Sequence, residues 1–335
     1  MLAVATTETC KLLTREGAAL IKVFDVFYGT THDGPGMRTT FFLKGCPLRC
    51  EWCHNPEGIS PKRQVWWDGR KCIGCLSCKD QCQNGALELD EQGVHIDRER
   101  CIACGLCAEQ CPARALSVIG RDRSAADMVR EAQKYCSYYD SFGGGVTLSG
   151  GEPLLQADQI APLLEMLRKK GIHTAVDSCG CVPKSALEKV LPHTCCILYD
   201  LKLMDTQEHQ RFTGVGNERI LENFRYLLYW KRERNPELDI WVRTPLIPGA
   251  TDTQENICAI AKFLISTGAV DQISRWELCA FNNVCEDKYR KLGTPWTMTG
   301  VPLMKQQQLV QVQQWICDTG FPVDKLVISG LAAEK

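Results

Sequence analysis

The chain has 335 residues, and its 39 lysines and arginines nearly balance its 40 aspartates and glutamates. This balance argues against nucleic acid or an anionic membrane as a partner, and the sequence has no apolar run of about 18 residues that could span a bilayer. Because the chain starts without a signal peptide, we expect a cytoplasmic protein whose 21 cysteines are reduced or bound to metal rather than paired as disulfides.

The first part of the chain predicts an extension followed by two strands. Residues 1–20 show no regular pattern, whereas residues 21–27 alternate apolar side chains with others and residues 39–43 are rich in strand-forming types. Between the two strands lies Asp33-Gly34-Pro35-Gly36, whose Asp-Gly and Pro-Gly pairs predict a turn.

Three cysteines, Cys46, Cys50 and Cys53, follow the second predicted strand with the spacing C-x3-C-x2-C. Thiolates select iron–sulfur clusters, zinc or copper(I). Three thiolates on a four-iron cluster would leave one iron with an open coordination position, where chemistry can take place. The alternative at this point is a small zinc site in which the neighbouring His54 is the fourth ligand.

A duplicated cysteine pattern occupies residues 66–118, and each half follows the spacing of bacterial ferredoxins. In such pairs the fourth cysteine of one run ligates the cluster of the other run. The sequence therefore predicts two clusters, one on Cys72, Cys75, Cys78 and Cys111 and the other on Cys101, Cys104, Cys107 and Cys82. The duplicated segment interrupts the first strand–helix repeat, so it is expected to be an insertion.

From Gly120 onward, predicted strands alternate with predicted helices. The first helix starts with a capping box at Ser124, and one apolar helical face is expected to run from Met128 to Tyr139. Counted from Thr39, the chain has six strand–helix repeats, which indicate an α/β fold with a parallel array, open or closed. The expected organisation is an extension (1–20), a discontinuous main domain (21–65 and 119–335) and an insert (66–118).

Polar residues stand where the predicted strands end, and in parallel β/α folds these ends share one face, where ligands bind. Each of these residues alone could be an ordinary loop residue, and their repetition is what indicates a site. They are Glu152, Asp177, Asp200, Lys202, Arg243 and Asn282. Cys179 and Cys181 lie beside this predicted site but are interpreted as packing residues.

Several motifs occur together in an order that resembles one protein family. They are KGCPLRCEWCHNPE (44–57), THDGPGMR (31–38), SGGEP (149–153), DSCG (177–180), DLK (200–202) and the two-cluster insert. Over about residues 20–330 the chain resembles the glycyl radical enzyme activating enzymes of the radical S-adenosylmethionine (SAM) superfamily. The resemblance implies a partial (β/α)6 barrel and three [4Fe–4S] clusters, with SAM bound to the open iron of the cluster on Cys46, Cys50 and Cys53.

The resemblance also implies roles for individual residues. Trp52 and His54, next to Cys53, would flank the adenosine, and Gly151 with Glu152 would meet the methionine amino group. Asp200, Leu201 and Lys202 of the DLK motif would lie with Asp177 around the SAM carboxylate and ribose, and the two aspartates could also hold a monovalent cation. Asp33, Gly34, Pro35 and Gly36 would contact the partner peptide. Many family members carry a histidine where this chain has Asn282, so the ligand contact expected there depends on an asparagine.

The implied activity is reductive cleavage of SAM to a 5′-deoxyadenosyl radical, which removes hydrogen from a backbone glycine of a partner glycyl radical enzyme. A low-potential donor such as flavodoxin or ferredoxin would supply the electron. Three alternatives remain. A radical SAM enzyme acting on a small molecule would not need Asp33–Gly36, a ferredoxin-type electron carrier would explain only residues 72–112, and the anaerobic ribonucleotide reductase activase is typically shorter and lacks the insert.

Overall fold

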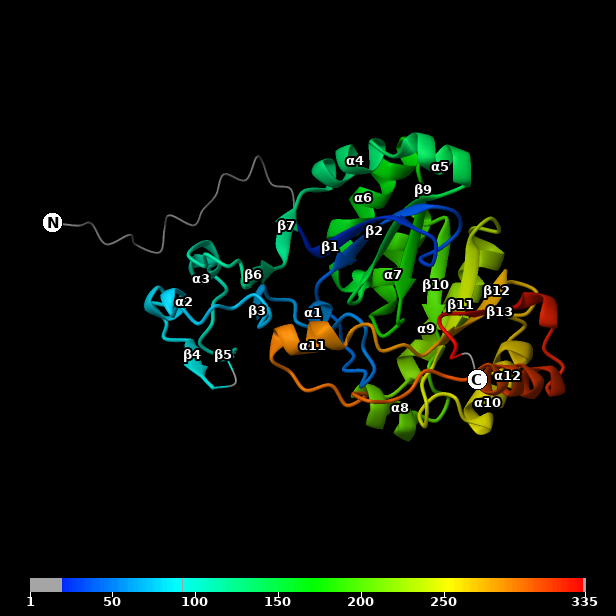
Figure 1. The fold of residues 1–335 in the computed structure, drawn as a ribbon. Coiled ribbons are helices and arrows are strands. Elements are labelled where there is room, and N and C mark those ends of the chain that lie inside the picture. Colours follow the sequence, from blue (N-terminus) through cyan, green and yellow to red (C-terminus); the bar gives the residue numbers. More distant parts are fainter. Residues whose placement is uncertain (1–19, 92, 334–335) are drawn as a thin grey trace.

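A computed structural model describes residues 20–91 and 93–333. Its main feature is a nine-stranded sheet with the order β13-β12-β11-β10-β9-β8-β2-β1-β7 (Figure 1). Strand β2 and strands β8 to β13 are parallel, whereas β1 is antiparallel to both β2 and β7. The strands are β1 (Ile21–Thr30), β2 (Arg38–Leu43), β7 (Arg121–Arg123), β8 (Gly145–Gly150), β9 (His173–Ser178), β10 (Cys196–Asp200), β11 (Asp239–Leu246), β12 (Arg275–Ala280) and β13 (Leu326–Ser329).

Helices connect the parallel strands and bury apolar faces against the sheet, as the strand–helix rhythm requires. They are α4 (Ala125–Gln133), α5 (Cys136–Phe142), α6 (Ala157–Lys169), α7 (Lys184–Val190), α8 (Thr206–Thr213), α9 (Glu218–Glu233), α10 (Gln254–Ser266), α11 (Glu286–Leu292) and α12 (Gln306–Asp318). Short 3-10 turns add η1 (Pro153–Gln156), η2 (Leu191–His193) and η3 (Val323–Lys325). The sheet ends at β13 on one side and at β7 on the other, so the predicted α/β fold with a partial barrel is confirmed.

Residues 64–119, between β2 and β7, form a smaller lobe at the left of Figure 1. Its strands pair with each other and not with the large sheet, β3 (Gln64–Trp67) with β6 (Leu116–Ile119) and β4 (Leu87–Asp90) with β5 (Gly93–Ile96). Two single-turn helices, α2 (Ser77–Asp80) and α3 (Leu106–Glu109), carry cysteines. This lobe has its own small core, which consists of Val65, Leu87, Val94, Ala103, Cys107 and Leu116.

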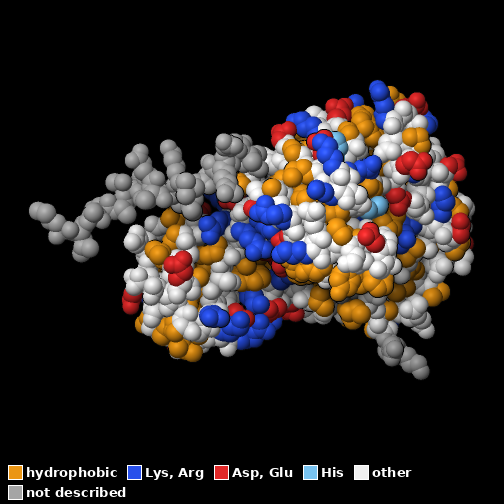
Figure 2. Space-filling model, turned by 90° about the horizontal axis from the view of Figure 1, so that it is seen from above, with side chains coloured by type: hydrophobic (Ala, Val, Ile, Leu, Met, Phe, Trp, Pro, Cys, Tyr) orange, Lys and Arg blue, Asp and Glu red, His pale blue; other side chains and the backbone are white. Residues whose placement is uncertain are grey.

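The surface seen from above shows the smaller lobe beside the larger one, with lysine and arginine side chains gathered around their junction (Figure 2). Within residues 20–91 and 93–333, no helix is both long and apolar enough to cross a membrane. The extension predicted for residues 1–20 lies almost entirely outside the described residues.

One predicted helix is divided in the structure. Ser124 caps α4 as predicted, because its hydroxyl accepts a hydrogen bond from the backbone N–H of Asp127 at 3.1 Å. The prediction of a single helical face from Met128 to Tyr139 is wrong, since α4 ends at Gln133 and α5 begins at Cys136. At the junction, the backbone N–H groups of residues 134 and 135 bond three residues back, so the last turn tightens and the chain changes direction.

Candidate active site

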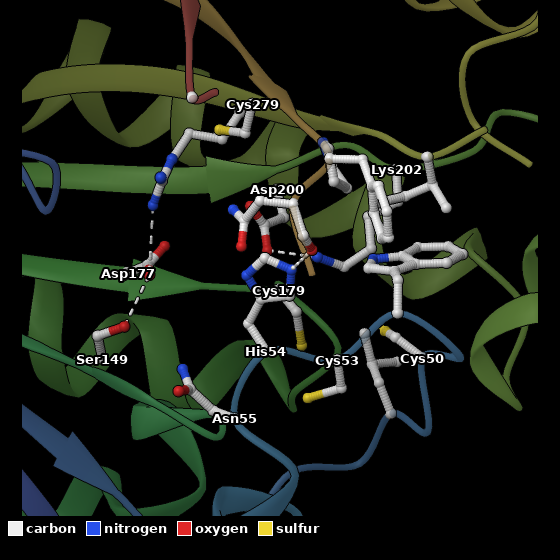
Figure 3. A pocket seen from close by; sticks show the side chains of 18 of the residues that line it. Cys50, Cys53, His54, Asn55, Ser149, Asp177, Cys179, Asp200, Lys202 and Cys279 are labelled. Atoms are coloured by element: carbon white, nitrogen blue, oxygen red, sulfur yellow. Dashed lines mark hydrogen bonds and ion pairs between the residues drawn. The ribbon is translucent and has the colours of Figure 1, made fainter. Parts of the chain in front are cut away.

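A cavity of about 580 Å³ lies where the parallel strands of the large sheet end (Figure 3). Its lining comes from the loop after β2, from the ends of β8, β9 and β10, and from β11, β12 and the segment after β13. It contains most of the predicted site residues, namely Cys46, Cys50, Trp52, Cys53, His54, Gly151, Asp177, Asp200, Lys202 and Asn282. Predicted site residues that are up to 236 positions apart in the chain therefore line one cavity.

The loop that carries the three cysteines is fixed by backbone hydrogen bonds to distant segments. Arg49 and Glu51 donate their backbone N–H groups to the carbonyls of Thr213 and Phe212 in α8, at 2.7 and 3.1 Å. Within the loop, the N–H of Cys53 donates to the carbonyl of Cys50 at 3.1 Å. These contacts hold the thiols in the cavity wall without using their side chains.

The chemistry of the three thiols fits a soft metal group. Burial raises the pKa of Cys50 to about 12 and raises that of Cys53 further, whereas a hydrogen bond from the Cys179 thiol lowers the pKa of Cys46. Buried thiols of this kind become thiolates when a metal compensates the charge. Among the described residues, no three His, Cys, Asp or Glu side chains lie close enough together to hold a single metal ion. The fit therefore rests on three soft donors that share a cavity with open volume.

Charged side chains form the opposite wall of the cavity. The guanidinium of Arg243 lies 3.5 Å from the carboxylate of Asp177, which also accepts a hydrogen bond from Ser149 at 2.8 Å. Burial raises the pKa of Asp177 to about 6, and the nearby Arg243 counteracts this rise. Lys202 contacts Asp200 at 2.5 Å, and although burial acts to lower its pKa, attraction to Asp200 raises it above the ordinary value. This wall offers both signs of charge to a zwitterionic ligand.

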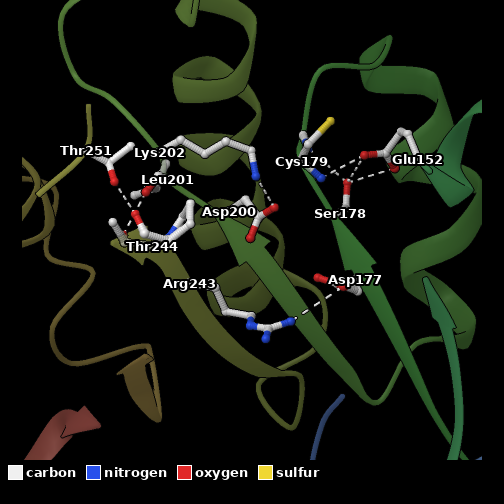
Figure 4. Close-up of polar contacts among 12 residues, drawn as sticks. Glu152, Asp177, Ser178, Cys179, Asp200, Leu201, Lys202, Arg243, Thr244 and Thr251 are labelled. Carbon is white, nitrogen blue, oxygen red and sulfur yellow. Dashed lines mark hydrogen bonds and ion pairs between the residues drawn. The ribbon is translucent and has the colours of Figure 1, made fainter. Parts of the chain in front are cut away.

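Glu152 and Leu201 do not line the cavity, although the sequence placed both in the site (Figure 4). Glu152 is fully buried, and its carboxylate accepts hydrogen bonds from the backbone N–H groups of Leu154 and Cys179 and from the hydroxyl of Ser178. Leu201 is buried as well and bonds through its backbone to β11. Both residues therefore lie beneath the cavity wall and hold its backbone in place.

Trp52, His54 and Asn282 lie together at the cavity. The ring Nε2 of His54 lies 3.1 Å from the backbone carbonyl of Asn282, and burial lowers the pKa of His54, so the neutral ring donates this hydrogen bond. The side-chain oxygen of Asn282 accepts a hydrogen bond from the backbone N–H of Val284 at 3.3 Å. The Asn282 amide group lines the cavity beside the imidazole.

The turn Asp33–Gly36 packs against the sheet near the cavity without lining it. The carboxylate of Asp33 accepts a hydrogen bond from Thr40 at 2.9 Å, and its carbonyl accepts one from Thr147 at 2.6 Å. Gly36 has a φ of +68°, and a Cβ there would lie 2.3 Å from the carbonyl oxygen of Phe142, so the position requires glycine. His32, the residue before the turn, does line the cavity.

The smaller lobe contains two separate hollows, each lined by four cysteines. One is lined by Cys72, Cys75, Cys78 and Cys111, and the other by Cys82, Cys101, Cys104 and Cys107. The fourth cysteine of each run thus faces the three cysteines of the other run, which is the grouping that the ferredoxin spacing predicts. The symmetry extends to the backbone, because the sulfurs of Cys82 and Cys111 each accept an N–H from the residue four positions later.

Several cavity residues were not among the predicted ligand contacts. Ser149 precedes the glycines of the SGGEP motif, and Cys179 follows Asp177 by two positions, so strand alternation could have indicated both. Arg243 was predicted as one of the polar strand-end residues that mark the site, but without a ligand contact of its own. Residues 329–331 carry no charged side chain that would have placed them at the cavity, and only the position of β13 brings them there.

Comparison with known proteins finds similarity over most of the chain. A family model described as a 4Fe-4S single cluster domain matches residues 32–221. The chain is 38% identical over 296 residues to the (2S)-3-sulfopropanediol dehydratase activating enzyme of Klebsiella oxytoca, covering 87% of this chain and 91% of that protein. It is 40% identical over 288 residues to the isethionate sulfite-lyase activating enzyme of Desulfovibrio desulfuricans (84% and 90%). It is 32% identical over 304 residues to the choline trimethylamine-lyase activating enzyme of Oleidesulfovibrio alaskensis (90% and 96%).

Proposed function

The chain belongs to the family of glycyl radical enzyme activating enzymes, and on that premise we propose the roles of its cavity, its smaller lobe and its turn at Asp33–Gly36. As a radical SAM enzyme it activates a partner glycyl radical enzyme. When bound and supplied with an electron, the cluster and SAM would provide the reductive cleavage that gives methionine and a 5′-deoxyadenosyl radical, and this radical would take one hydrogen atom from a backbone glycine of the partner, giving 5′-deoxyadenosine and a glycyl radical.

Cys46, Cys50 and Cys53 are the proposed ligands of the catalytic [4Fe–4S] cluster. The observation that carries this assignment is that all three thiols share one cavity with the charged ends of the parallel strands. Three thiolates leave the fourth iron without a protein ligand, so SAM can bind it through its amino and carboxylate groups. Cys50 and Cys53 are partly buried in the cavity wall, where a cluster would contact them.

Asp177, Asp200 and Lys202 are proposed to orient SAM by charge. The ammonium of Lys202 complements a carboxylate, and the two aspartates complement a sulfonium, an amino group or a monovalent cation, which we propose as an additional occupant. Trp52 and His54 would border the adenosine, with Asn282 beside them. Gly151 lines the cavity through backbone, which permits close approach of the methionine amino group.

Glu152 and Leu201 are buried beneath the cavity wall and do not line the cavity. Through its hydrogen bond to the backbone N–H of Cys179, Glu152 fixes the start of the turn after β9, two positions beyond Asp177 in the strand. Leu201 anchors the DLK segment to β11, because its backbone N–H donates to the carbonyl of Arg243 at 2.9 Å. Their proposed role is to position the residues that meet SAM.

The eight cysteines of the smaller lobe are proposed to hold two further [4Fe–4S] clusters, one in each hollow. These clusters would relay electrons from a low-potential donor such as flavodoxin or ferredoxin. The exposed positions of Cys75 and Cys104 support this role, because they bring each hollow to the surface where a donor can approach. The corresponding organisation is an extension at 1–20, a main domain at 21–65 and 119–335 and an insert at 66–118, in a cytoplasmic protein.

The turn Asp33–Gly36 is proposed to contact the glycine-bearing peptide of the partner. It lies next to His32, which lines the cavity, so a peptide that follows the turn would reach SAM. Relatives between 32% and 40% identical are named for different partner enzymes. The partner is therefore identified by experiment, starting from glycyl radical enzymes encoded near this chain.

The test is anaerobic reconstitution followed by electron paramagnetic resonance (EPR). Three four-iron clusters correspond to about twelve irons per chain, and about four would contradict the two clusters of the insert. With SAM, a reductant and the correct partner, a glycyl doublet should appear on the partner. Cleavage of SAM with modification of a small molecule and no protein radical would overturn the proposal. Asn282→Ala should weaken SAM binding, and unchanged affinity would remove this side chain from the site.

A further inference from the structure

Helix α11 contacts the loop that carries Cys46, Cys50 and Cys53, which is called the cysteine loop below. The two contacting segments are more than 230 positions apart in the chain. The ammonium of Lys288 donates to the backbone carbonyl of His54 at 3.0 Å and to the side-chain oxygen of Asn55 at 2.9 Å. The hydroxyl of Tyr289 donates to the carbonyl of Cys53 at 2.9 Å. Two adjacent residues of α11 thus hold three consecutive residues of the loop.

The contact also neutralises a buried charge. Glu57, in the short helix α1 (Pro56–Ile59), has a side chain that is only 3% exposed, and its Oε1 lies 2.8 Å from the ammonium of Lys288. Its other oxygen has no hydrogen-bond partner among the described residues. The ring of Tyr289 stacks on Trp296 at 5.5 Å, so its hydroxyl is aimed at the loop by packing. Lys288 and Tyr289 are therefore fixed and cannot relax easily to other partners.

The same helix contacts the smaller lobe. Asp287 pairs with Arg70 at 3.1 Å, and Lys291 lies 3.8 Å from Asp68. In addition, the guanidinium of Arg98 donates to the carbonyl of the last residue of α11. This helix of seven residues therefore connects the lobe that carries eight cysteines with the loop that carries Cys46, Cys50 and Cys53.

We propose that α11 sets the position of the cysteine loop, with Lys288 and Tyr289 as positioning residues for the segment from Cys53 to Asn55. Helix α11 would affect the catalytic cluster and SAM through the backbone of the loop. It also connects this loop with the insert. The inference deepens the proposed function, because it assumes that the loop holds the catalytic cluster. Hydrogen bonds and packing around cysteine ligands tune a cluster, so displacement of the loop should be visible in spectra.

The test compares Tyr289→Phe with the unaltered protein after full reconstitution. The substitution keeps the stacked ring and removes the bond to the Cys53 carbonyl. We expect unchanged iron content, SAM affinity weakened about fivefold, as expected for one lost hydrogen bond, and altered g values in the SAM-dependent EPR signal of the reduced protein. Tyr139→Phe is the matched control, since its hydroxyl is also buried and donates to Thr39 at 2.6 Å, far from the loop. The control should lose stability and keep both SAM readouts.

Lys288→Met leaves Glu57 buried without its partner and could prevent folding, so the double variant Lys288→Met with Glu57→Gln accompanies it. We expect the double variant to fold, and to show weakened SAM binding and an altered EPR signal because the His54 and Asn55 contacts are still lost. Native SAM affinity and EPR signal in both Tyr289→Phe and the double variant would overturn the proposal, as would equal effects of Tyr139→Phe. If the unaltered protein shows no SAM-dependent signal, the proposed function fails instead.

Discussion

Replacing Glu152 by glutamine tests whether this residue is part of the framework or a ligand of SAM. In the structure its carboxylate accepts hydrogen bonds from three donors: the N–H of Leu154 at 3.0 Å, the N–H of Cys179 at 2.7 Å and the hydroxyl of Ser178, which lies 3.0 and 3.1 Å from the two carboxylate oxygens. All of these partners act as donors, and the side chain is fully buried. A carboxylate satisfies every donor, whereas an amide has only one accepting oxygen.

The expected cost follows from these contacts. In Glu152→Gln one oxygen remains to accept one backbone N–H, and the new NH2 group faces the other N–H, which becomes an unsatisfied buried donor. Such a donor costs roughly 1–3 kcal/mol, and the lost bond to a charged acceptor contributed roughly 1.5–3 kcal/mol. Because these two costs overlap, we expect the free energy of unfolding to fall by about 2–4 kcal/mol.

The assay is urea unfolding of the anaerobic protein, followed by SAM titration under native conditions. Glu165→Gln is the matched control, because Glu165 is a solvent-accessible residue of α6 paired with Lys169, and its loss should leave the stability nearly unchanged. SAM affinity should fall only about threefold in Glu152→Gln, through looser positioning of the turn after β9. Native stability combined with a loss of SAM affinity of more than about tenfold would refute the framework role and make Glu152 a direct ligand contact.

Two further predictions concern other parts of the fold. Gly36→Ala should destabilise the protein by more than about 2 kcal/mol in urea unfolding, because the new Cβ would clash with the carbonyl of Phe142 at a positive φ, and Gly300→Ala, with open space around it, should cost less. Burial lowers the pKa of His173 from 6.5 to about 4, so the folded state keeps this ring neutral while the unfolded chain binds a proton. The contribution of His173 to the free energy of unfolding is therefore fully present above pH 6.5 and is lost as the pH falls toward 4. The loss is about 1–2 kcal/mol near pH 5 after allowance for partial exposure. His173→Gln should remove this part of the acid dependence, and an unchanged slope of stability against pH would contradict the depressed pKa.

The cysteine groups were predictable from the sequence because ligand spacing is a local property. The turns between Cys46 and Cys53 can bring three thiols together only in a narrow range of geometries, and the structure places all three at one cavity. The crossed grouping of Cys82 and Cys111 follows from the duplication itself, and both hollows show it. The polar strand ends were predictable for a related reason, since parallel strands present their carboxyl ends on one side of a sheet.

The remaining features depend on contacts between distant segments. Periodicity predicted the apolar side of α4 and α5, but not the break at residues 134 and 135, because both halves bury the same face. Glu152 resembles a site residue in sequence, and only the backbone of the turn after β9 shows that its carboxylate points into protein. No local pattern marks Lys288 or Tyr289, since their partners lie more than 230 positions earlier.

The size of the cavity constrains how the partner can be activated. Ligand cavities of roughly 300–1,000 Å³ hold one drug-sized molecule, and this cavity of about 580 Å³ falls within that range. If SAM occupies this cavity as proposed, hydrogen abstraction requires the partner's glycine within near-contact distance of the reacting carbon. The sheet ends at β13 and β7 without closing, and the segment after β13 lines the cavity, so the barrel has an open side. On the proposed function, an extended segment of the partner reaches the cavity more readily than a compact surface, so we expect the partner to expose its glycine loop before this chain acts on it.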